Sequence, residues 1–214
     1  MERLLEKADT MKNIESLIRK ATELKSEGLV EGQISEELNV SRETVTWLLT
    51  HGEKSVEAGG PKDISVDWSE IGRSAFRLNN ISQALTELVY EVLGESDLDV
   101  DVVVGIALSG VPLASQVATH LDVDLAVYMP SKQVASQGTD FHGNLSVNFA
   151  GVNGKCCVII DDVITSGRTL EEAVAYLEEH GAKVNAIVVL IDKKGGERVS
   201  GVNVRSLMKV LRVN

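Results

Sequence analysis

An apolar, strand-like run that leads into two adjacent carboxylates and a hydroxyl-rich loop constrains this chain more than any other feature. The run ends at Ile160, Asp161 and Asp162 follow it, and Thr165–Thr169 then leads into an amphipathic helix. In an open α/β sheet, the carboxyl end of a strand is where ligands bind. The segment therefore predicts an α/β sheet with a ligand site at this edge.

The residue types in this loop suit a phosphorylated sugar. Backbone N–H groups at a helix N-terminus favour an anion, and a glycine lets the backbone approach it closely. Two carboxylates can accept hydrogen bonds from vicinal sugar hydroxyls. The expected phosphate and sugar contacts are Asp161, Asp162, Thr165, Ser166, Gly167, Arg168 and Thr169. Taken singly, each residue also fits a strand, an Asp-rich turn and a capped helix without a ligand.

The chain divides into regions of different character. Residues 1–52 read as consecutive helices, and residues 53–67, with Gly59, Gly60 and Pro61 among charges, read as a linker. Residues 68–214 alternate strand and helix patterns, which favours a mostly parallel sheet. The expected strands are 100–108, 125–129, 155–160, 183–191 and 202–210. The expected helices are 81–93, 109–120 and 169–180.

Composition places the chain among soluble globular proteins, with 43% hydrophobic and 25% charged residues. No apolar run approaches the roughly 20 residues that span a bilayer, and the charged N-terminus lacks the apolar segment of a secretory signal, so we expect a cytoplasmic protein. The net charge of -11 disfavours nonspecific nucleic-acid binding over the whole surface, but it leaves room for a local DNA-binding face. Cys156 and Cys157 are adjacent and are expected to fill a buried strand.

Val158–Leu170 resembles the phosphoribosyl diphosphate (PRPP) signature of type I phosphoribosyltransferases almost position for position. Over residues 70–210 the chain is most similar to the orotate phosphoribosyltransferases within that family. The resemblance implies the type I phosphoribosyltransferase fold and PRPP as a ligand. It also implies Mg²⁺ that accompanies PRPP and is held by the ligand rather than by a protein cage.

Three further segments carry the resemblance. They are similar to the pyrophosphate loop, the hood over the base and the mobile catalytic loop of the enzymes, and they are, in that order, Gly105–Ala114, Gly72–Asn79 and Ser131–Gly138. The resemblance implies ligand contacts within each of them. On the pyrophosphate side these are Ser109, Gly110 and Lys132, and in the hood they are Phe76 and Arg77.

The same segments depart from the enzymes. Orotate enzymes carry a Lys where this chain has Ser109, and their mobile loop reads Arg-Lys-x-x-Lys-x-His-Gly. Aligned on Lys132, the other three positions are Ser131, Ala135 and Gln137. The departing pyrophosphate needs cationic stabilisation, and losing one such donor typically costs about 10²–10³ in rate. We therefore expect a site that binds without turnover and has no catalytic residues, although a nearby histidine, His142, is a candidate for the missing one.

Residues 33–49 resemble a helix-turn-helix. The expected small core is Ile34, Leu38, Val40, Val45 and Leu48. The second helix is expected to present four side chains to a major groove, Ser41, Arg42, Thr44 and Thr46. Residues 1–55 hold eight basic and eleven acidic residues, a balance of -3, which is not the usual basic footprint of a DNA-binding domain. A dimerisation or hood element is the alternative.

A small all-α helix-turn-helix domain before an orotate-like α/β domain resembles the archaeal PyrE-like regulators of the GfcR group. The resemblance implies a dimeric transcription regulator that binds promoter DNA and senses PRPP or another phosphorylated ribose or sugar. The main alternative is an orotate or other base phosphoribosyltransferase with an accessory N-terminal domain, which the intact acidic pair supports. A third is an interaction protein with a decayed site.

Overall fold

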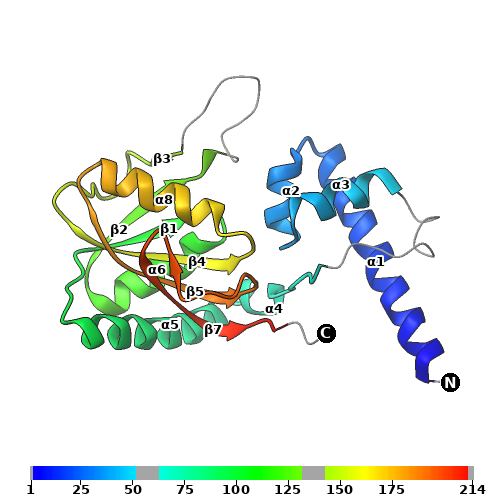
Figure 1. Ribbon diagram of the computed structural model, residues 1–214, viewed down its shortest axis with the longest axis horizontal. Coiled ribbons are helices and arrows are strands. Elements are labelled where there is room, and N and C mark those ends of the chain that lie inside the picture. The colour runs from blue at the N-terminus through cyan, green and yellow to red at the C-terminus, as the bar shows by residue number, and fades with distance from the viewer. Residues whose placement is uncertain (1, 52–62, 132–142, 212–214) are drawn as a thin grey trace. The chain divides into compact units, whose positions relative to one another are not determined.

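In a computed structural model that describes residues 2–51, 63–131 and 143–211, the chain forms two units, Met1–Asp67 and Trp68–Asn214. The first unit holds α1 (Glu2–Ser26), α2 (Glu31–Glu37) and α3 (Arg42–His51) (Figure 1). Its buried apolar residues are Ile18, Ala21, Ile34, Leu38, Val40, Val45 and Leu48. All five residues expected for the helix-turn-helix core are therefore confirmed as core.

Local sequence signals set the ends of these helices. Gly28 has a φ of 98° directly after α1, a conformation that glycine adopts without a Cβ clash. Asn39 has a φ of 51° in the turn between α2 and α3, and Asn tolerates that region better than most residues. Ser41 then caps α3, because its Oγ accepts a hydrogen bond from the Thr44 backbone N–H at 3.2 Å.

The expected linker, residues 53–67, is only partly described. Residues 53–62 lie outside the described residues. Residues 63–67 belong to the helical unit, because side chains and backbone of residues 63–66 are hydrogen-bonded to the segment 38–44. The end of the expected linker is thus an ordered part of the helical unit.

The second unit is built on a seven-stranded sheet of order β3-β2-β1-β4-β5-β7-β6. The five inner strands are parallel, and the short strands β3 and β6 pair antiparallel at the two edges. The strands are β1 (Val102–Ile106), β2 (Asp124–Met129), β3 (Asn144–Leu145), β4 (Cys156–Ile164), β5 (Lys183–Asp192), β6 (Arg198–Val199) and β7 (Val202–Lys209). The mostly parallel α/β sheet expected from the sequence is confirmed.

Helices cover both faces of this sheet (Figure 1). They are α5 (Ala75–Ser96), α6 (Gly110–Leu121) and α8 (Arg168–Glu179), while the short helix α4 (Ser69–Gly72) packs against α5. On one face, the α8 side chains Leu170 and Leu177 share a core with Val104 and Ile159, while α5 and α6 pack against β1, β4, β5 and β7. Burial on both faces explains why these strands are nearly continuous apolar runs. No helix among the described residues is long and apolar enough to cross a membrane.

One strand boundary differs from the expectation in a way that matters for the site. The sequence places the end of this strand at Ile160, but β4 continues to Ile164 because it stays paired with β5 through Ile164 and Asp192. Polar residues in a strand weaken an apolar pattern without ending the backbone pairing, so the pattern stops too early. The short elements α4, β3 and β6 were not anticipated from the sequence.

Candidate functional site

The two acids lie inside β4, in a stretch that is paired with β5 and no longer with β1. Pairing between β1 and β4 stops at Gly105 and Ile160, whereas pairing between β4 and β5 continues beyond it. Asp161 and Asp162 are therefore held by backbone pairing on one side and lie beyond the last β1–β4 pair on the other. Each residue is 8% exposed, so the strand fixes both carboxylates in a largely dry place at the carboxyl end of the sheet.

The start of α6 packs directly against this pair. A Cβ added to Gly110 would lie 2.8 Å from the Ile160 carbonyl oxygen and 3.0 Å from Asp161 Oδ1. Only glycine fits there without displacing the backbone of β4. The structure thus brings Gly110, expected on the pyrophosphate side, into contact with the acidic pair, and Ser109 precedes it at the N-terminus of α6. Lys132 lies outside the described residues.

Asp162 is hydrogen-bonded to both Trp68 and Asp161. Its Oδ2 accepts a hydrogen bond from the Trp68 indole Nε1–H at 2.8 Å, and its backbone N–H donates to Asp161 Oδ1 at 2.9 Å. Burial raises the pKa of the Asp162 carboxyl above its ordinary value, while the hydrogen bonds from Trp68 and at Asp161 oppose that rise. The carboxylate is therefore held in an environment that favours a partner able to donate hydrogen bonds.

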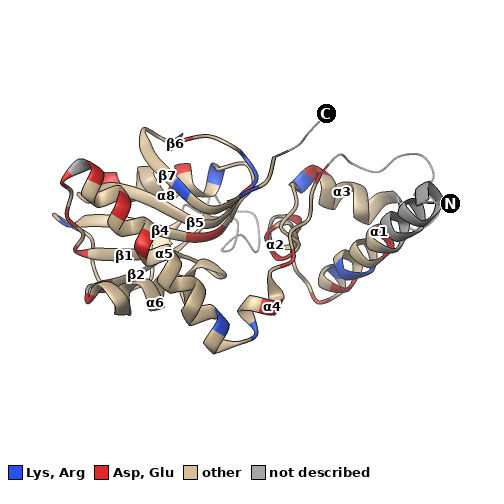
Figure 2. Cartoon of the chain, turned by 90° about the horizontal axis from the view of Figure 1, so that it is seen from below, with Lys and Arg blue, Asp and Glu red and all other residues tan. Residues whose placement is uncertain are grey.

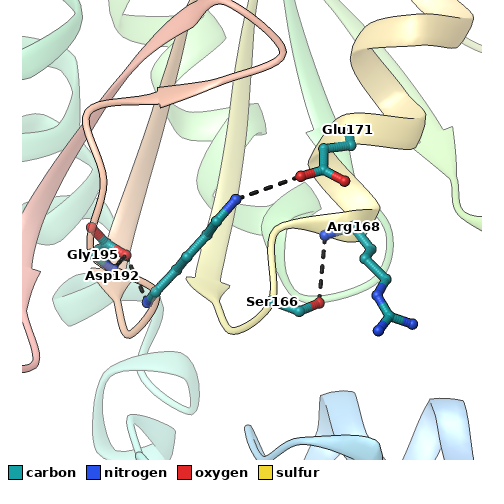
Figure 3. Close-up of polar contacts among 6 residues, drawn as sticks. Ser166, Arg168, Glu171, Asp192 and Gly195 are labelled. Carbon is teal, nitrogen blue, oxygen red and sulfur yellow. Dashed lines mark hydrogen bonds and ion pairs between the residues drawn. The ribbon is translucent and has the colours of Figure 1, made fainter.

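The loop after β4 forms the N-terminus of α8. Gly167 is buried, stands at the N-cap position and has a φ of 85°, which explains a glycine there. Ser166 and Arg168 are exposed, and Thr165 and Thr169 are partly exposed. The Arg168 backbone N–H points at Ser166 Oγ at 3.5 Å, the long limit of a hydrogen bond (Figure 3). The loop therefore offers hydroxyls and the first backbone N–H groups of α8 at one place.

Lys194 joins this loop from the neighbouring strand. Asp192, the last residue of β5, accepts hydrogen bonds through Oδ1 from the backbone N–H groups of Lys194 and Gly195, both at 2.9 Å (Figure 3). The turn places Lys194 Nζ 3.5 Å from Glu171 Oε1 and 2.7 Å from where a Cβ on Gly167 would lie. A cation thus stands over the loop that is expected to hold a phosphate.

Sequence reasoning missed both Lys194 and Trp68. The signal for Lys194 was present, because Lys193-Lys194-Gly195-Gly196 follows a buried strand directly, at the edge where parallel strands present ligand contacts. Trp68 carried no such signal. It lies 94 residues before Asp162 in a short segment without clear periodicity.

The expected hood residues lie on the first turn of α5. Phe76 is 75% exposed. Arg77 is half exposed, and its guanidinium lies 3.5 Å from Glu70 of α4, which is also paired with Arg73. The charge of Arg77 is thus shared with a surface carboxylate. Contact of Phe76 or Arg77 with a base stays a prediction.

Glu172 of α8 binds the residues on either side of 132–142, Ser131 and Gly143. Residues 132–142 themselves lie outside the described residues. Glu172 Oε1 accepts hydrogen bonds from Tyr128 Oη at 3.0 Å, from the Ser131 backbone N–H at 2.9 Å and from the Gly143 backbone N–H at 3.0 Å. Its Oε2 accepts from Ser131 Oγ at 3.0 Å. The helix that begins at the candidate phosphate loop therefore also binds Ser131 and Gly143.

The helical unit offers a separate candidate surface on α3. Arg42, Glu43, Thr46 and Thr50 are exposed. The expectation for Thr44 needs correction, because its side chain is only 4% exposed and its Oγ1 donates to Asp63 Oδ2 at 2.9 Å. Position 44 faces the interior since it lies one helical turn before the core residue Leu48. Basic and acidic residues are interspersed over this unit (Figure 2).

Comparisons with known proteins identify one family domain and several full-length relatives. Residues 75–210 match the family described as the phosphoribosyl transferase domain. The transcriptional regulator GfcR of Methanothrix thermoacetophila is 70% identical over 204 residues, which cover 95% of this chain and 100% of that protein. Another GfcR, from Haloferax volcanii, is 44% identical over 211 residues, covering 95% of this chain and 99% of that protein.

Solved structures support the fold of the second unit. The orotate phosphoribosyltransferase of Aeropyrum pernix matches with a TM-score of 0.54 at 21% identity, over 72% of this chain and 82% of that chain. At this identity the likeness concerns the fold. The expected type I phosphoribosyltransferase fold is thereby confirmed.

Proposed function

This chain belongs to the GfcR family of transcriptional regulators, and from that premise we propose that it binds promoter DNA through its helical unit and senses PRPP or a related phosphorylated ribose or sugar through its α/β unit. The observation that carries the sensing half is the buried acidic pair of β4 beside an anion-binding helix N-terminus. Such a regulator acts in the cytoplasm.

The contacts around the site support a ligand with vicinal hydroxyls and a phosphate. When they are ionised, Asp161 and Asp162 can only accept hydrogen bonds, so sugar hydroxyls are suitable donors to them. The N-terminus of α8 supplies N–H groups and the positive end of a helix dipole, and Lys194 adds a full positive charge 3.5 Å from Glu171 over the same loop. The first contacts proposed for the phosphate are Thr165–Thr169.

The pyrophosphate half of the site supports binding over catalysis. Ser109 stands where the orotate enzymes carry a Lys, and Ser131 stands where their mobile loop begins with an Arg. The Ser131 hydroxyl is engaged with Glu172. Each lost cationic donor slows pyrophosphate departure by about 10²–10³. We therefore propose a receptor in which chemistry on the ligand is very slow.

Magnesium fits this proposal as a companion of PRPP. Carboxylate and phosphate oxygens are the ligands that Mg²⁺ prefers, and it keeps several waters. Asp161 and Asp162 provide carboxylates next to the expected position of the ribose. When bound, the ion neutralises diphosphate charge near these acids, and the acids hold the hydroxyl groups in place.

For DNA, the proposed contacts are the exposed residues of α3 and its cap. Arg42 and Thr46 are exposed on α3, and Ser41 is its N-cap. Arg can read guanine or a phosphate, and Thr can contact base edges or phosphates. A dimer would place two such helices on the half-sites of a palindromic operator.

Calorimetry on the purified full chain tests the sensing half. PRPP, ribose 5-phosphate and a panel of nucleotides are titrated with and without Mg²⁺. The proposal expects saturable binding of at least one phosphorylated ribose, and its loss in D161N and D162N. Absence of binding by every compound in the panel would contradict it.

A transferase remains the second candidate, because the acidic pair is intact and the phosphoribosyl transferase domain is present. PRPP-dependent consumption of orotate and of purine bases is the decisive assay. Turnover at ordinary enzyme rates that disappears in D161N and D162N would replace the receptor by an enzyme.

A further inference from the structure

Trp68 is hydrogen-bonded to Asp162, one of the two acids that are proposed to bind the sugar. Its indole Nε1–H donates to Asp162 Oδ2 at 2.8 Å. The ring is also seated against α4, since a Cβ on Gly72 would lie 2.9 Å from the indole atom Cζ3. Glycine at that position leaves room for the ring. The indole is therefore held at the acidic pair by packing as well as by a hydrogen bond.

The indole N–H and a sugar hydroxyl can each donate a hydrogen bond to this carboxylate. Asp162 is 8% exposed, so water has little access to its oxygens, and loss of a hydrogen-bond donor to a buried carboxylate is unfavourable. In the structure, Trp68 supplies one such donor to Asp162. A sugar hydroxyl that donates to the same Oδ2 has to share that oxygen with Trp68 or displace the indole from it.

The chain just before Trp68 is fastened to the helix-turn-helix. Asp63 Oδ2 accepts hydrogen bonds from the Ser41 backbone N–H at 2.7 Å and from Thr44 Oγ1 at 2.9 Å. Both donors belong to the first turn of α3 or its cap. Asp63 therefore holds the start of the helix that is proposed to read DNA.

Two more hydrogen bonds fasten the same stretch to the turn between α2 and α3. Ser65 Oγ donates to the Leu38 carbonyl at 2.9 Å, and Asn39 Nδ2 donates to the Val66 carbonyl at 3.0 Å. We call residues 63–66 the strap. It is joined to Trp68 by one residue, Asp67.

Only one residue, Asp67, separates Trp68 from the strap. An extended residue spans only about 3.3–3.6 Å, so Asp67 keeps Trp68 and the strap close together along the chain. A movement of Trp68 therefore acts on the strap through the backbone, and the strap carries the hydrogen bonds that hold α3.

We propose that Trp68 is the effector-sensing residue of this protein: a ligand hydroxyl replaces its indole on Asp162, and the release of Trp68 is passed through Asp67 to the strap and so to α3. The inference rests on the proposed function, because it assumes that a phosphorylated sugar binds at Asp161 and Asp162. By thermodynamic linkage, DNA and ligand then change each other's affinity by the same factor.

The chain contains two tryptophans, Trp47 and Trp68, which makes a direct optical test available. In the full-length W47F variant, all tryptophan emission comes from Trp68. PRPP and ribose 5-phosphate carry no aromatic base and leave the emission window clear. Titration of W47F with each compound is expected to shift the emission to longer wavelength as the indole leaves the carboxylate, with a midpoint that equals the calorimetric Kd.

Two substitutions complete the test. W68F removes the donor and keeps an aromatic ring, so PRPP is expected to bind roughly tenfold more tightly, and DNA affinity is expected to become insensitive to PRPP. D63N weakens the anchoring of the strap and leaves Trp68 in place. In a W47F background it should keep the ligand-dependent emission shift and reduce the response of DNA binding to PRPP.

The outcomes separate this inference from the proposed function. If calorimetry detects no binding of either compound, the proposed sugar site itself is wrong. If PRPP binds but the emission of W47F does not shift on titration, the sugar site stands and the role of Trp68 is contradicted. The same conclusion follows if W68F binds PRPP with wild-type affinity. The emission test leaves Trp68 unaltered, so it remains decisive even if W68F folds poorly.

Discussion

At the scale of single residues, the site combines a binding role with a stability cost in Asp162. Burial raises the pKa of its carboxyl above the ordinary value. A raised folded-state pKa means that the stability contributed by this group is fully present below the ordinary carboxyl pKa and is lost as the pH rises through the folded value. At neutral pH the ionised, ligand-free Asp162 therefore works against the fold.

Asn in place of Asp162 is expected to stabilise the protein at neutral pH. Its amide oxygen can still accept from Trp68, while the charge is gone. We expect D162N to be more stable than the wild type by roughly 0.5–2 kcal/mol at pH 7, with a difference that shrinks towards pH 4. Urea unfolding at the two pH values measures this, with the exposed Asp124 changed to Asn as the control. A difference independent of pH would contradict the assignment.

Gly110 is expected to be irreplaceable because of its contact with β4. A methyl group there would lie 2.8 Å from the Ile160 carbonyl oxygen, so G110A should lower the unfolding free energy by roughly 1–3 kcal/mol and weaken PRPP binding by displacing Asp161. Gly94 is the matched control, since it lies within α5 with no heavy atom within 4 Å of an added Cβ. G94A should be neutral or slightly stabilising. Equal effects of the two substitutions would argue against the close packing.

Lys194 is expected to contribute to phosphate binding. K194Q keeps most of the side-chain length and removes the charge, so we expect PRPP to bind roughly tenfold more weakly, as for loss of one charge-assisted contact. Lys183, exposed at the opposite end of β5, provides the control K183Q. Calorimetry gives both affinities. Unchanged binding in K194Q would remove Lys194 from the site.

At the scale of elements, the sequence predicted what depends on neighbours in the chain. The glycine after α1, the cap of α3 and the apolar runs of the inner strands are local signals, and the structure agrees with them. The end of β4 was misjudged because pairing with β5 continues through residues that are polar. The contact of Trp68 with Asp162 depends on how the sheet brings distant segments together, and no local pattern encodes it.

Glu172 gives a prediction at this scale. Its carboxylate accepts four hydrogen bonds that join α8 to β2 and to both sides of residues 132–142. E172A leaves partly buried donors without this acceptor, so we expect the unfolding free energy to fall by roughly 2–4 kcal/mol. E178A, on the exposed side of the same helix, should change it by less than about 0.5 kcal/mol. Thermal or urea unfolding decides, and similar effects for both would contradict the anchoring role.

At the scale of the whole molecule, the two units have separate cores and one short covalent connection through Asp67 and Trp68. Each half of the proposed function rests on its own unit. The sequence indicated both halves and the α/β fold, whereas the link proposed between them rests on hydrogen bonds of Trp68 and of the strap that no local pattern encodes. Regulation then requires that ligand and DNA affect each other across this connection.

DNA affinity measured with and without PRPP tests that claim most directly. Anisotropy of labelled DNA from the protein's own promoter region, at one fixed salt concentration, gives the two values of Kd for the full chain. The account predicts salt-dependent binding whose Kd changes with PRPP by about 5–150-fold, the usual range of allosteric coupling, and a change that is abolished in D161N and D162N. An equal Kd with and without saturating PRPP would contradict it.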